Sequence, residues 1–407
     1  MKVGNPATGD DFFGREQELR DVWQHLEHDH LTLPGVRRLG KTSLMIRITE
    51  QASAKGVLAK RLDVSHITKV EQFLELIDQS FPAAGITHFL SEKKQAASNW
   101  LSRLKQVEFQ LPEIFGGGGV SVALNARPDI PWGAQALALQ QRLQNQPLLL
   151  LIDEFPVLLE RLLRNGNTEA EQLLIVLRQW RQQGNWRFVF TGSIGLQSLL
   201  ESYRLTVHMN DCYEFPLGPM RKKEATAMWC YFADKQQWTS NEELADTAMS
   251  NLGWCSPYYI CWLLDETMRA ARIRYEETGL APADGTIACG ELTATDLETA
   301  YQYMLNQRSR FIHWKQRLSN LLVEPELGFC LALLTLLSRE PDGFTLQQLN
   351  QRLSAHEINP DKRADLLQKL IVRLNDEGYI SQPNEKGCVQ FLAFPLRDWW
   401  SRNHVGF

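Results

Sequence analysis

At 407 residues, with 44% hydrophobic and 22% charged side chains, the chain has the composition of a globular protein and room for two or three domains. A formal net charge of -5 argues against a protein that coats nucleic acid by bulk positive charge. The seven cysteines are odd in number, widely spread and without a C-x-x-C pair, so neither a disulfide framework nor a zinc site is expected. Such cysteine usage is typical of reduced thiols in a cytoplasmic protein.

The first predicted element is a helix that begins after Gly14 and runs to Leu26. Its first turn is acidic, which suits the positive end of the helix dipole. Its apolar face comprises Leu19, Val22, Trp23 and Leu26. A second interpretation, in which the turn before this helix borders a nucleotide base, stays open. The residues ahead of it are polar and no apolar run is long enough for a membrane span, so neither a secretory leader nor a membrane anchor is expected.

A strand-turn-helix pattern follows, in which the apolar run Leu31–Leu33 enters a Pro-Gly turn and a helical run leaves it at Lys41. Within it, Gly35, Gly40, Lys41 and Thr42 fit the phosphate-loop pattern G-x-x-x-x-G-K-[ST] in full. The glycines let the backbone wrap a phosphate chain with its amides pointing inward. Lys41 is then expected to reach the β- and γ-phosphates, and the Thr42 hydroxyl to ligate Mg²⁺. The competing interpretation is a coincidental glycine-rich turn.

The next segment alternates helical and extended patterns. Residues 56–67 read as a strand ending at Asp63. A run of four glycines within 115–124 favours a turn or hairpin over a second phosphate loop, because no Lys-Ser/Thr pair and no helix follow it. Helices are predicted at 72–81, 92–104 and 133–143.

The apolar run Leu148–Ile152 predicts a strand buried on both faces. It ends in Asp153 and Glu154, at the end of the strand where open α/β sheets place their ligands. Asp153 is expected to hold Mg²⁺, and Glu154 to polarise the attacking water. The alternative is an ordinary acidic turn after a buried strand.

Predicted helices at 157–163 and 169–181 are followed by a further strand, residues 186–190, which runs into Thr191-Gly192-Ser193. A polar residue at the end of such a strand commonly senses the γ-phosphate, so Thr191 or Ser193 is a candidate sensor. The alternative is that these residues simply end the strand. Alternation of strands and helices predicts a parallel three-layer α/β sandwich over residues 27–216.

The alternation of strands and helices ends at residues 215–219, which mark a predicted domain boundary. Beyond it the pattern is helical, at 224–233, 242–252, 258–274 and 296–318, with a Gly/Ala/Pro-rich linker at 278–291. The last part predicts helices at 327–338, 346–353 and 361–376, with Thr345 as an N-cap, followed by two strands around the turn 384–387. This order is typical of a winged helix.

Charge gives little support to DNA binding by that last part. On its third helix Lys362, Arg363, Lys369 and Arg373 are predicted to face outward. Residues 344–407, however, hold eight Lys and Arg against seven Asp and Glu, an excess of only one positive charge. A protein-docking or autoinhibitory wing is therefore at least as well supported, and the closing Phe394-to-Trp400 run reads as an aromatic plug.

Taken together, these stretches resemble the prokaryotic STAND-type P-loop ATPases, a group related to AAA+ proteins that includes the archaeal ATPase family. The resemblance rests on Phe13-Gly14-Arg15-Glu16, GVRRLGKTSL, LLLLIDEFP, FTGS and the turn from Gly253 to Pro257, which is longer than the family's Gly-x-Pro. It implies that Phe13, Gly14 and Arg15 line the base, that Arg38 contacts the phosphates or a facing element, and that Pro257 packs on adenine. The nucleotide-binding set it implies is Phe13, Gly14, Arg15, Gly35, Arg37, Arg38, Leu39, Gly40, Lys41, Thr42, Ser43 and Pro257. Arginine-finger candidates are Arg178, Arg181 and Arg204.

The resemblance implies an ATPase core over 1–216, a helical lid over 217–318 and a winged helix over 319–407. The predicted function is an ATP/ADP- and Mg²⁺-dependent switch with low turnover, whose nucleotide state controls domain opening, recruitment of a protein partner and self-assembly, in signalling or antiviral defence. Its first alternative is a DNA-binding ATPase that regulates transposition, replication or transcription through the winged helix. A remodelling ring and a pseudo-ATPase that binds nucleotide without hydrolysis also stay open.

Overall fold

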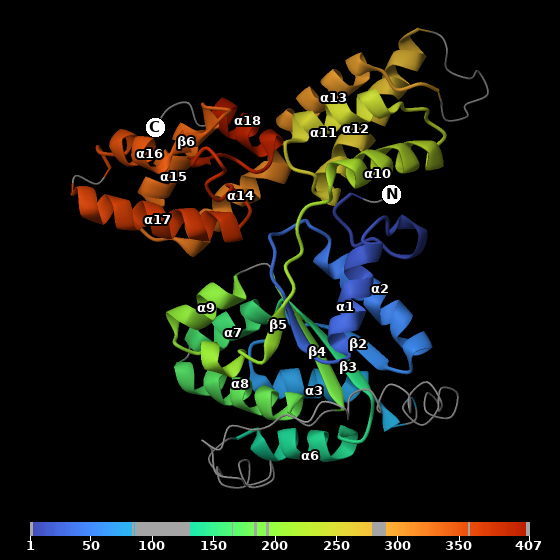
Figure 1. Cartoon of the computed structure of the whole chain (residues 1–407), viewed down its shortest axis with the longest axis vertical. Coiled ribbons are helices and arrows are strands. Elements are labelled where there is room, and N and C mark those ends of the chain that lie inside the picture. Colours follow the sequence, from blue (N-terminus) through green and yellow to red (C-terminus); the bar gives the residue numbers. More distant parts are fainter. Residues whose placement is uncertain are drawn as a thin grey trace. The chain divides into compact units, whose positions relative to one another are not determined.

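The computed structural model describes residues 3–83, 85, 131–164, 166–182, 185–192, 195–278, 290–356 and 359–403. The helix predicted at 92–104, the hairpin at 115–124, most of the linker at 278–291 and Ser193 lie outside these residues. The chain divides into two units (Figure 1). The core unit comprises Thr8–Gly35 and Lys41–Leu217, and the C-terminal unit comprises Met1–Ala7, Val36–Gly40 and Gly218–Phe407.

The core unit is built on a five-stranded sheet in the order β2-β3-β4-β1-β5, and each of its strand pairs is parallel. The strands are β1 (His30–Leu33), β2 (Leu58–Asp63), β3 (Leu148–Asp153), β4 (Trp186–Thr191) and β5 (Cys212–Glu214). Asp63 lies opposite Asp153 in the ladder, and Leu33 opposite Thr191. The carboxyl ends of four strands therefore meet at one edge of the sheet, as the parallel sandwich predicts.

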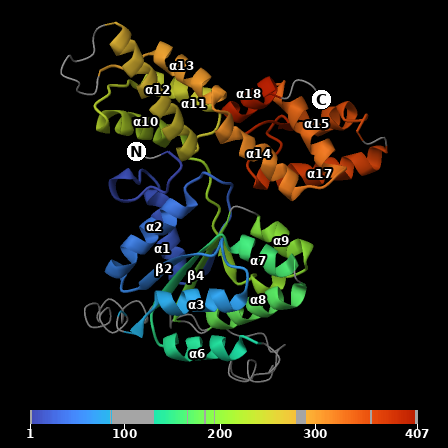
Figure 2. The same ribbon diagram turned by 180° about the vertical axis from the view of Figure 1, so that it is seen from behind.

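Helices cover both faces of this sheet (Figures 1 and 2). On one face α3 (Val70–Ser80), α6 (Gly133–Leu143), α7 (Phe155–Arg164) and α8 (Asn167–Arg181) share a hydrophobic cluster with β3 and β4. On the other lie α1 (Glu16–Leu26) and α2 (Lys41–Ala52). The shorter elements of the unit are η1 (Gly9–Asp11), η2 (Ser53–Lys55), α9 (Leu196–Ser202) and η3 (Thr206–His208).

The central strands are buried along their whole length. All six residues of β3 are buried, which confirms the buried strand predicted from the apolar run 148–152, and all six residues of β4 are buried as well. Alternate residues Leu148, Leu150 and Ile152 join the cluster under α7 and α8. Burying each such leucine contributes about 1.5–3 kcal/mol, so this strand anchors the carboxylates that follow it. The edge strand β5 was not predicted, because its three residues are too few to show an alternation of apolar and polar positions.

His30 on β1 is a buried histidine held neutral. Its Nε2 lies 3.1 Å from the carbonyl oxygen of Arg181. Burial, with the positive charges of Arg187 and Arg181, lowers the pKa of His30 well below its ordinary value. Protonation at this position therefore favours the unfolded chain.

We expect the free energy of unfolding to fall as pH drops below the unfolded histidine pKa of about 6.5, by up to about 1.4 kcal/mol per pH unit for His30. The folded pKa is depressed, so the stabilisation is complete above the unfolded value and is lost as pH falls. Urea unfolding of the protein and of His30→Gln between pH 5 and 8 measures this as a difference in slope. Equal slopes would exclude His30 as the titrating group.

The C-terminal unit begins with helices α10 (Lys222–Lys235), α11 (Glu242–Leu252), α12 (Pro257–Glu277), α13 (Ala294–Asn306) and α14 (Arg308–Leu321). The stretch 296–318 is helical as predicted, but it is divided between α13 and α14 at Gln307, whose φ is −79° and ψ 72°. The Gln307 side-chain amide donates to Glu266 on α12. This contact, together with the packing of α13 along α12, replaces helix continuity, a tertiary effect that periodicity does not register.

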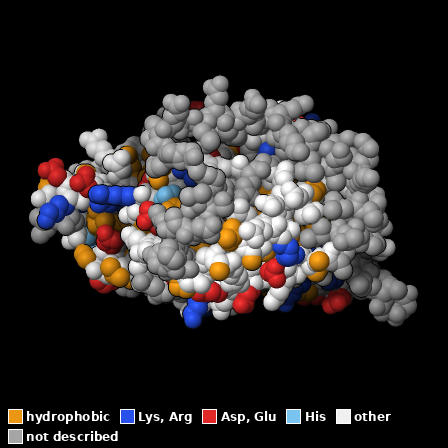
Figure 3. All heavy atoms as spheres, turned by 90° about the horizontal axis from the view of Figure 1, so that it is seen from below, with side chains coloured by type: hydrophobic (Ala, Val, Ile, Leu, Met, Phe, Trp, Pro, Cys, Tyr) orange, Lys and Arg blue, Asp and Glu red, His pale blue; other side chains and the backbone are white. Residues whose placement is uncertain are grey.

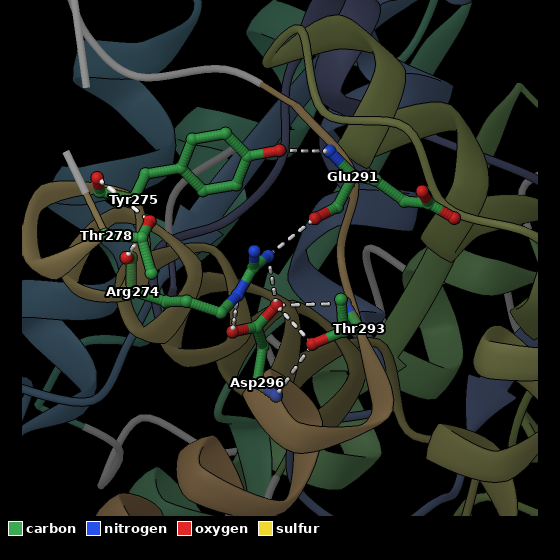
Figure 4. A network of polar contacts seen from close by, with 6 residues as sticks. All are labelled: Arg274, Tyr275, Thr278, Glu291, Thr293 and Asp296. Carbon is green, nitrogen blue, oxygen red and sulfur yellow. Dashed lines mark hydrogen bonds and ion pairs between the residues drawn. The ribbon is translucent and has the colours of Figure 1, made fainter. Parts of the chain in front are cut away.

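A polar network ties α12 to α13 on either side of the linker (Figure 4). The Arg274 guanidinium donates to both oxygens of Asp296, at 2.9 and 2.8 Å, and to the carbonyl of Glu291 at 2.8 Å. Thr293 and Asp296 form the capping box that starts α13. Burial opposes ionisation of Asp296, but the hydrogen bonds from Arg274 and Thr293 prevail and its pKa is lowered. One ion pair thus fixes both ends of the connection.

The last part of the chain contains α15 (Glu326–Ser338), β6 (Phe344–Thr345), α16 (Leu346–Arg352), α17 (Pro360–Asp376), β7 (Cys388–Val389) and α18 (Phe394–Asn403). Thr345 caps α16 by accepting from the amide of Gln348, as predicted. The turn at 384–387 is also confirmed, since Asn384 Oδ1 accepts from the amides of Lys386 and Cys388. Strand β6 before α16 and helix α18 were not predicted. The winged-helix assignment stays a prediction.

One of the four cations predicted to face outward on α17 does not. Lys362, Lys369 and Arg373 are exposed, but Arg363 is 7% exposed and its Nε donates to Asn350 Oδ1 at 2.7 Å. Position 363 falls in the apolar stripe of this helix, four residues before the buried Leu367, so its stem packs inward. The prediction for Arg363 is wrong. On the face drawn in Figure 3, acidic and basic side chains of the described residues are interspersed.

None of the described helices combines the length and apolar character that crossing a bilayer requires.

Candidate functional site

The phosphate loop joins β1 to α2 and takes the left-handed conformation repeatedly. Gly35 has φ 147°, Arg38 has φ 71° and Gly40 has φ 89°. Positive φ costs glycine little, which explains two of these positions. A methyl group built on Gly40 would meet no atom within 4 Å, so the backbone here borders open space. The loop therefore has the repeated left-handed conformation that lets successive backbone amides point toward an anion.

Lys41, the first residue of α2, is 8% exposed, and its ammonium donates to the carbonyl oxygen of Gly35. The lysine thus folds back across the loop that it closes. A buried ammonium that is bonded to the loop backbone is poised to exchange that carbonyl for a phosphate oxygen, which is the stronger acceptor because it is charged.

Two oxygen-bearing side chains converge beside this lysine. Thr42 follows it on α2, and its Oγ1 donates to Oδ2 of Asp153 at the end of β3, 3.1 Å away and 111 residues later in the sequence. Asp153 is 5% exposed. Burial and the neighbouring Glu154 raise its pKa, while Thr42 and Arg61 act in the opposite direction. The fold brings together the two residues predicted to ligate a metal.

The donor set fits Mg²⁺. A hydroxyl and a carboxylate are hard oxygen ligands, and Mg²⁺ is usually held by one or two such groups with phosphate oxygens and water completing its shell. Within the part of the chain that the structure describes, no group of three His, Cys, Asp or Glu is placed to hold a metal ion. The roles of Thr42 and Asp153 as metal ligands stay a prediction.

Glu154 stands at a sharp turn between β3 and α7. Its φ of 60° is left-handed, an uncommon conformation for a non-glycine residue, and its carbonyl accepts from the amides of Val157 and Leu158 at the start of α7. Glu154 thus lies one residue beyond Asp153, and its side chain is partly exposed.

Gly192 was not singled out from the sequence, yet it sets the space around this turn. A side-chain carbon at position 192 would overlap the ring of Pro156 and lie 3.6 Å from the Cα of Glu154. The backbone at the exit of β4 therefore packs closely against the Pro156 ring in the first turn of α7. The signal in the sequence is the glycine inside Thr191-Gly192-Ser193.

The candidate sensor Thr191 is 2% exposed, and its hydroxyl donates to the carbonyl of Leu33 at 3.2 Å. The threonine thus ties β4 to the residue that leads into the phosphate loop. Its sensor role stays a prediction, and Ser193 lies outside the described residues.

Residues Val36–Gly40 group with the C-terminal unit. The carbonyl of Arg38 accepts from Ser256 Oγ at 2.6 Å, its guanidinium lies 4.0 Å from the centre of the Tyr258 ring, and its Nη2 is 2.8 Å from Nε2 of His313. Burial, followed by the Arg38 charge, lowers the pKa of His313, so the imidazole is suited to accept this hydrogen bond. The role of Arg38 toward the phosphates stays a prediction. The other predicted loop residues differ in exposure: Arg37 is exposed, Leu39 is buried and Ser43 is half-buried.

The residues predicted to border the base lie at the start of α1 and of α12. Gly14 and Arg15 have φ 69° and 67°, and the Arg15 guanidinium pairs with Glu18 at 2.6 Å. Phe13 precedes them. Pro257 is the first residue of α12. Their contact with a nucleotide stays a prediction.

Of the arginine-finger candidates, Arg181 is engaged within the core unit. It donates to both oxygens of Asp211 at 2.8 Å and to the carbonyl of His208, and its side chain has no exposed surface. Arg178 donates to the Val207 carbonyl at 2.5 Å, and Arg204 has a left-handed φ of 59°. Arg181 therefore has a structural role.

Comparison with known proteins supports the fold and no more. No protein-family profile and no curated protein sequence matches the chain. A Walker-type ATPase of Pyrococcus abyssi aligns over 98% of this chain and 98% of its own, with a TM-score of 0.58 at 15% identity. The ORC2 protein of Aeropyrum pernix, in complexes with ADPNP and ADP, aligns over 97% of this chain and 95% of its own, with a TM-score of 0.54 at 14% identity. The parallel sheet and its helices have the fold of P-loop NTPases.

Proposed function

We propose that the protein binds ATP together with Mg²⁺ and hydrolyses it, with ADP as the bound product. The observation that carries this proposal is the hydrogen bond between Thr42 and Asp153. The phosphate-loop motif and the acidic strand were identified separately in the sequence, and a coincidental glycine-rich turn has no reason to meet a buried carboxylate from a distant strand. The fold shared with a Walker-type ATPase supports the same reading.

Each residue of the site has a distinct task in this proposal. The left-handed loop from Gly35 to Gly40 presents backbone amides to the phosphate chain. Lys41 gives up the Gly35 carbonyl for a phosphate oxygen and stabilises the charge that develops on it. Thr42 and Asp153 hold the metal, which when bound screens the phosphate charges. Glu154 accepts a proton from the attacking water. Thr191 or Ser193 senses the γ-phosphate.

Removal of the metal tests this assignment. We expect phosphate release from ATP to fall by about 100-fold or more when excess EDTA replaces Mg²⁺, because the loss of a metal at the phosphates costs several kcal/mol of transition-state stabilisation. Phosphate release is measured with a coupled assay at saturating ATP, and re-addition of Mg²⁺ serves as the control. Turnover that persists in EDTA would contradict the metal-dependent mechanism.

We further propose that nucleotide binding acts on the C-terminal unit as a switch. Support comes from Arg38, which belongs to the phosphate loop in sequence and bonds to Ser256, Tyr258 and His313. A phosphate that reshapes the loop changes these contacts. ATP and ADP then favour different arrangements of the chain, provided that each nucleotide binds the two arrangements with unequal affinity. In this proposal the helices of residues 217–318 act as a lid, with Pro257 against adenine, and residues 319–407 are a winged helix.

The output we favour is recruitment of a protein partner, with nucleotide-dependent self-assembly, in the cytoplasm and in signalling or defence. Regulation of DNA transactions is the weaker alternative, since Arg363 is buried and the residues after 343 carry an excess of one positive charge. The similarity to ORC2 concerns the fold, and it does not change our preference for a protein partner over DNA.

A further inference from the structure

A positively charged side chain contacts the carboxylate that is proposed to hold Mg²⁺. Arg61, on β2, donates from its Nη1 to Oδ2 of Asp153 at 2.9 Å. Thr42 donates to the same oxygen at 3.1 Å. The Asp153 side chain is 7% exposed and that of Arg61 29% exposed, so solvent screens this pair only in part. The oxygen that faces the phosphate-loop helix is therefore also held by a guanidinium.

The sheet dictates this placement. Strands β2 and β3 pair in parallel, with Arg61 opposite Leu151 and Asp63 opposite Asp153. Arg61 thus stands two residues short of the strand end, and its long side chain runs along β2 to reach the carboxylate on the neighbouring strand. Asp63, two residues on, lies on the same face of the strand.

We propose that Arg61 is a positioning residue which occupies Oδ2 of Asp153 when Mg²⁺ is absent and thereby sets the Mg²⁺ concentration at which the site loads. This inference rests on the proposed function. A metal that binds Asp153 must share the carboxylate with a fixed positive charge or displace it, and like charges that share one carboxylate repel each other. Arg61 therefore lowers the affinity of the nucleotide site for Mg²⁺ and keeps Asp153 paired in its absence.

The direction in which Mg²⁺ affinity changes when Arg61 is removed distinguishes this role from a merely structural one. If Arg61 only oriented Asp153, its removal would leave the carboxylate less well placed and would weaken Mg²⁺ binding. Thr42 remains as a donor to the same oxygen after Arg61 is removed, so we expect the orientation to survive and the charge effect to dominate. Removal of the charge then strengthens Mg²⁺ binding.

The test is a Mg²⁺ titration of the full-length protein with a fluorescent ATP analogue at fixed concentration. The readout is the Mg²⁺ concentration that gives half of the metal-dependent gain in nucleotide affinity. We expect Arg61→Gln, and likewise Arg61→Met, to lower this midpoint by about fivefold or more. Arg61→Lys, which keeps the charge, is expected to stay within twofold of the wild type. Arg164→Gln, at the exposed end of α7, removes the same charge away from the site and serves as the matched control.

The outcomes are distinguishable. An unchanged or raised midpoint in Arg61→Gln and Arg61→Met, beside a wild type that binds nucleotide with Mg²⁺, would overturn this inference alone. A wild type that binds no nucleotide would overturn the proposed function as well. The unfolding midpoint of each variant is measured beside the titration, and having two charge-removing variants keeps the test decisive if one of them fails to fold.

Discussion

Lys41→Ala is expected to abolish nucleotide binding at concentrations where the wild type is saturated. The ammonium of Lys41 is buried at the end of the loop, and its loss as a charged partner of the phosphates costs about 3 kcal/mol or more, roughly 100-fold or more in Kd. Isothermal titration with ADP and with ATP measures the effect.

The matched control for this experiment is Lys60→Ala, which removes an exposed lysine from β2 of the same unit. It is expected to bind as the wild type does. Because Lys41 also bonds to the Gly35 carbonyl, the unfolding temperature of Lys41→Ala has to be measured as well. Binding of ADP by a folded Lys41→Ala within a few-fold of wild type would exclude the loop as the phosphate site.

Glu154→Gln is expected to show the opposite pattern, with binding retained and turnover lost. Glutamine keeps the shape of the side chain and tolerates the left-handed φ of 60° as glutamate does, but it cannot accept a proton from water. Loss of a general base typically costs about 10²–10⁴-fold in rate. Single-turnover phosphate release, measured beside the Kd for ATP, separates the two effects.

Glu160→Gln, on the helix that follows, is the matched control and is expected to hydrolyse ATP at the wild-type rate. If Glu154→Gln also turns over at that rate, Glu154 is not the base. If it fails to bind ATP, its role lies in the geometry of the turn that Gly192 and Pro156 help to define.

The sequence predicted those parts of the site that depend on local pattern. The phosphate loop is a spacing of residue types, and the strand before Asp153 is an unbroken apolar run, so both could be recognised without knowledge of the fold. The burial of residues 148–152 of β3 followed from the same run. The N-cap at Thr345 was predictable because its partner is three residues away.

The parts that were missed depend on contacts between distant segments. Arg61 reaches Asp153 only because β2 pairs with β3, and no local pattern states which strands are neighbours. Gln307 interrupts a helical pattern because of a partner on α12. Arg363 was placed outward on charge alone, although its spacing from Leu367 puts it in the apolar stripe. The charge of this residue led to the wrong prediction of its exposure, whereas its position in the helical repeat indicates burial.

The close approach of Gly192 to Pro156 has a consequence for tracing distant relatives of this chain. Since any side chain at 192 would overlap the proline ring, the two positions are not free to change independently. In homologous sequences we expect glycine at 192 wherever proline stands at 156, and larger residues at 192 to occur together with a smaller or more flexible residue at 156. Such paired change would provide an alignment anchor that is independent of the phosphate-loop motif.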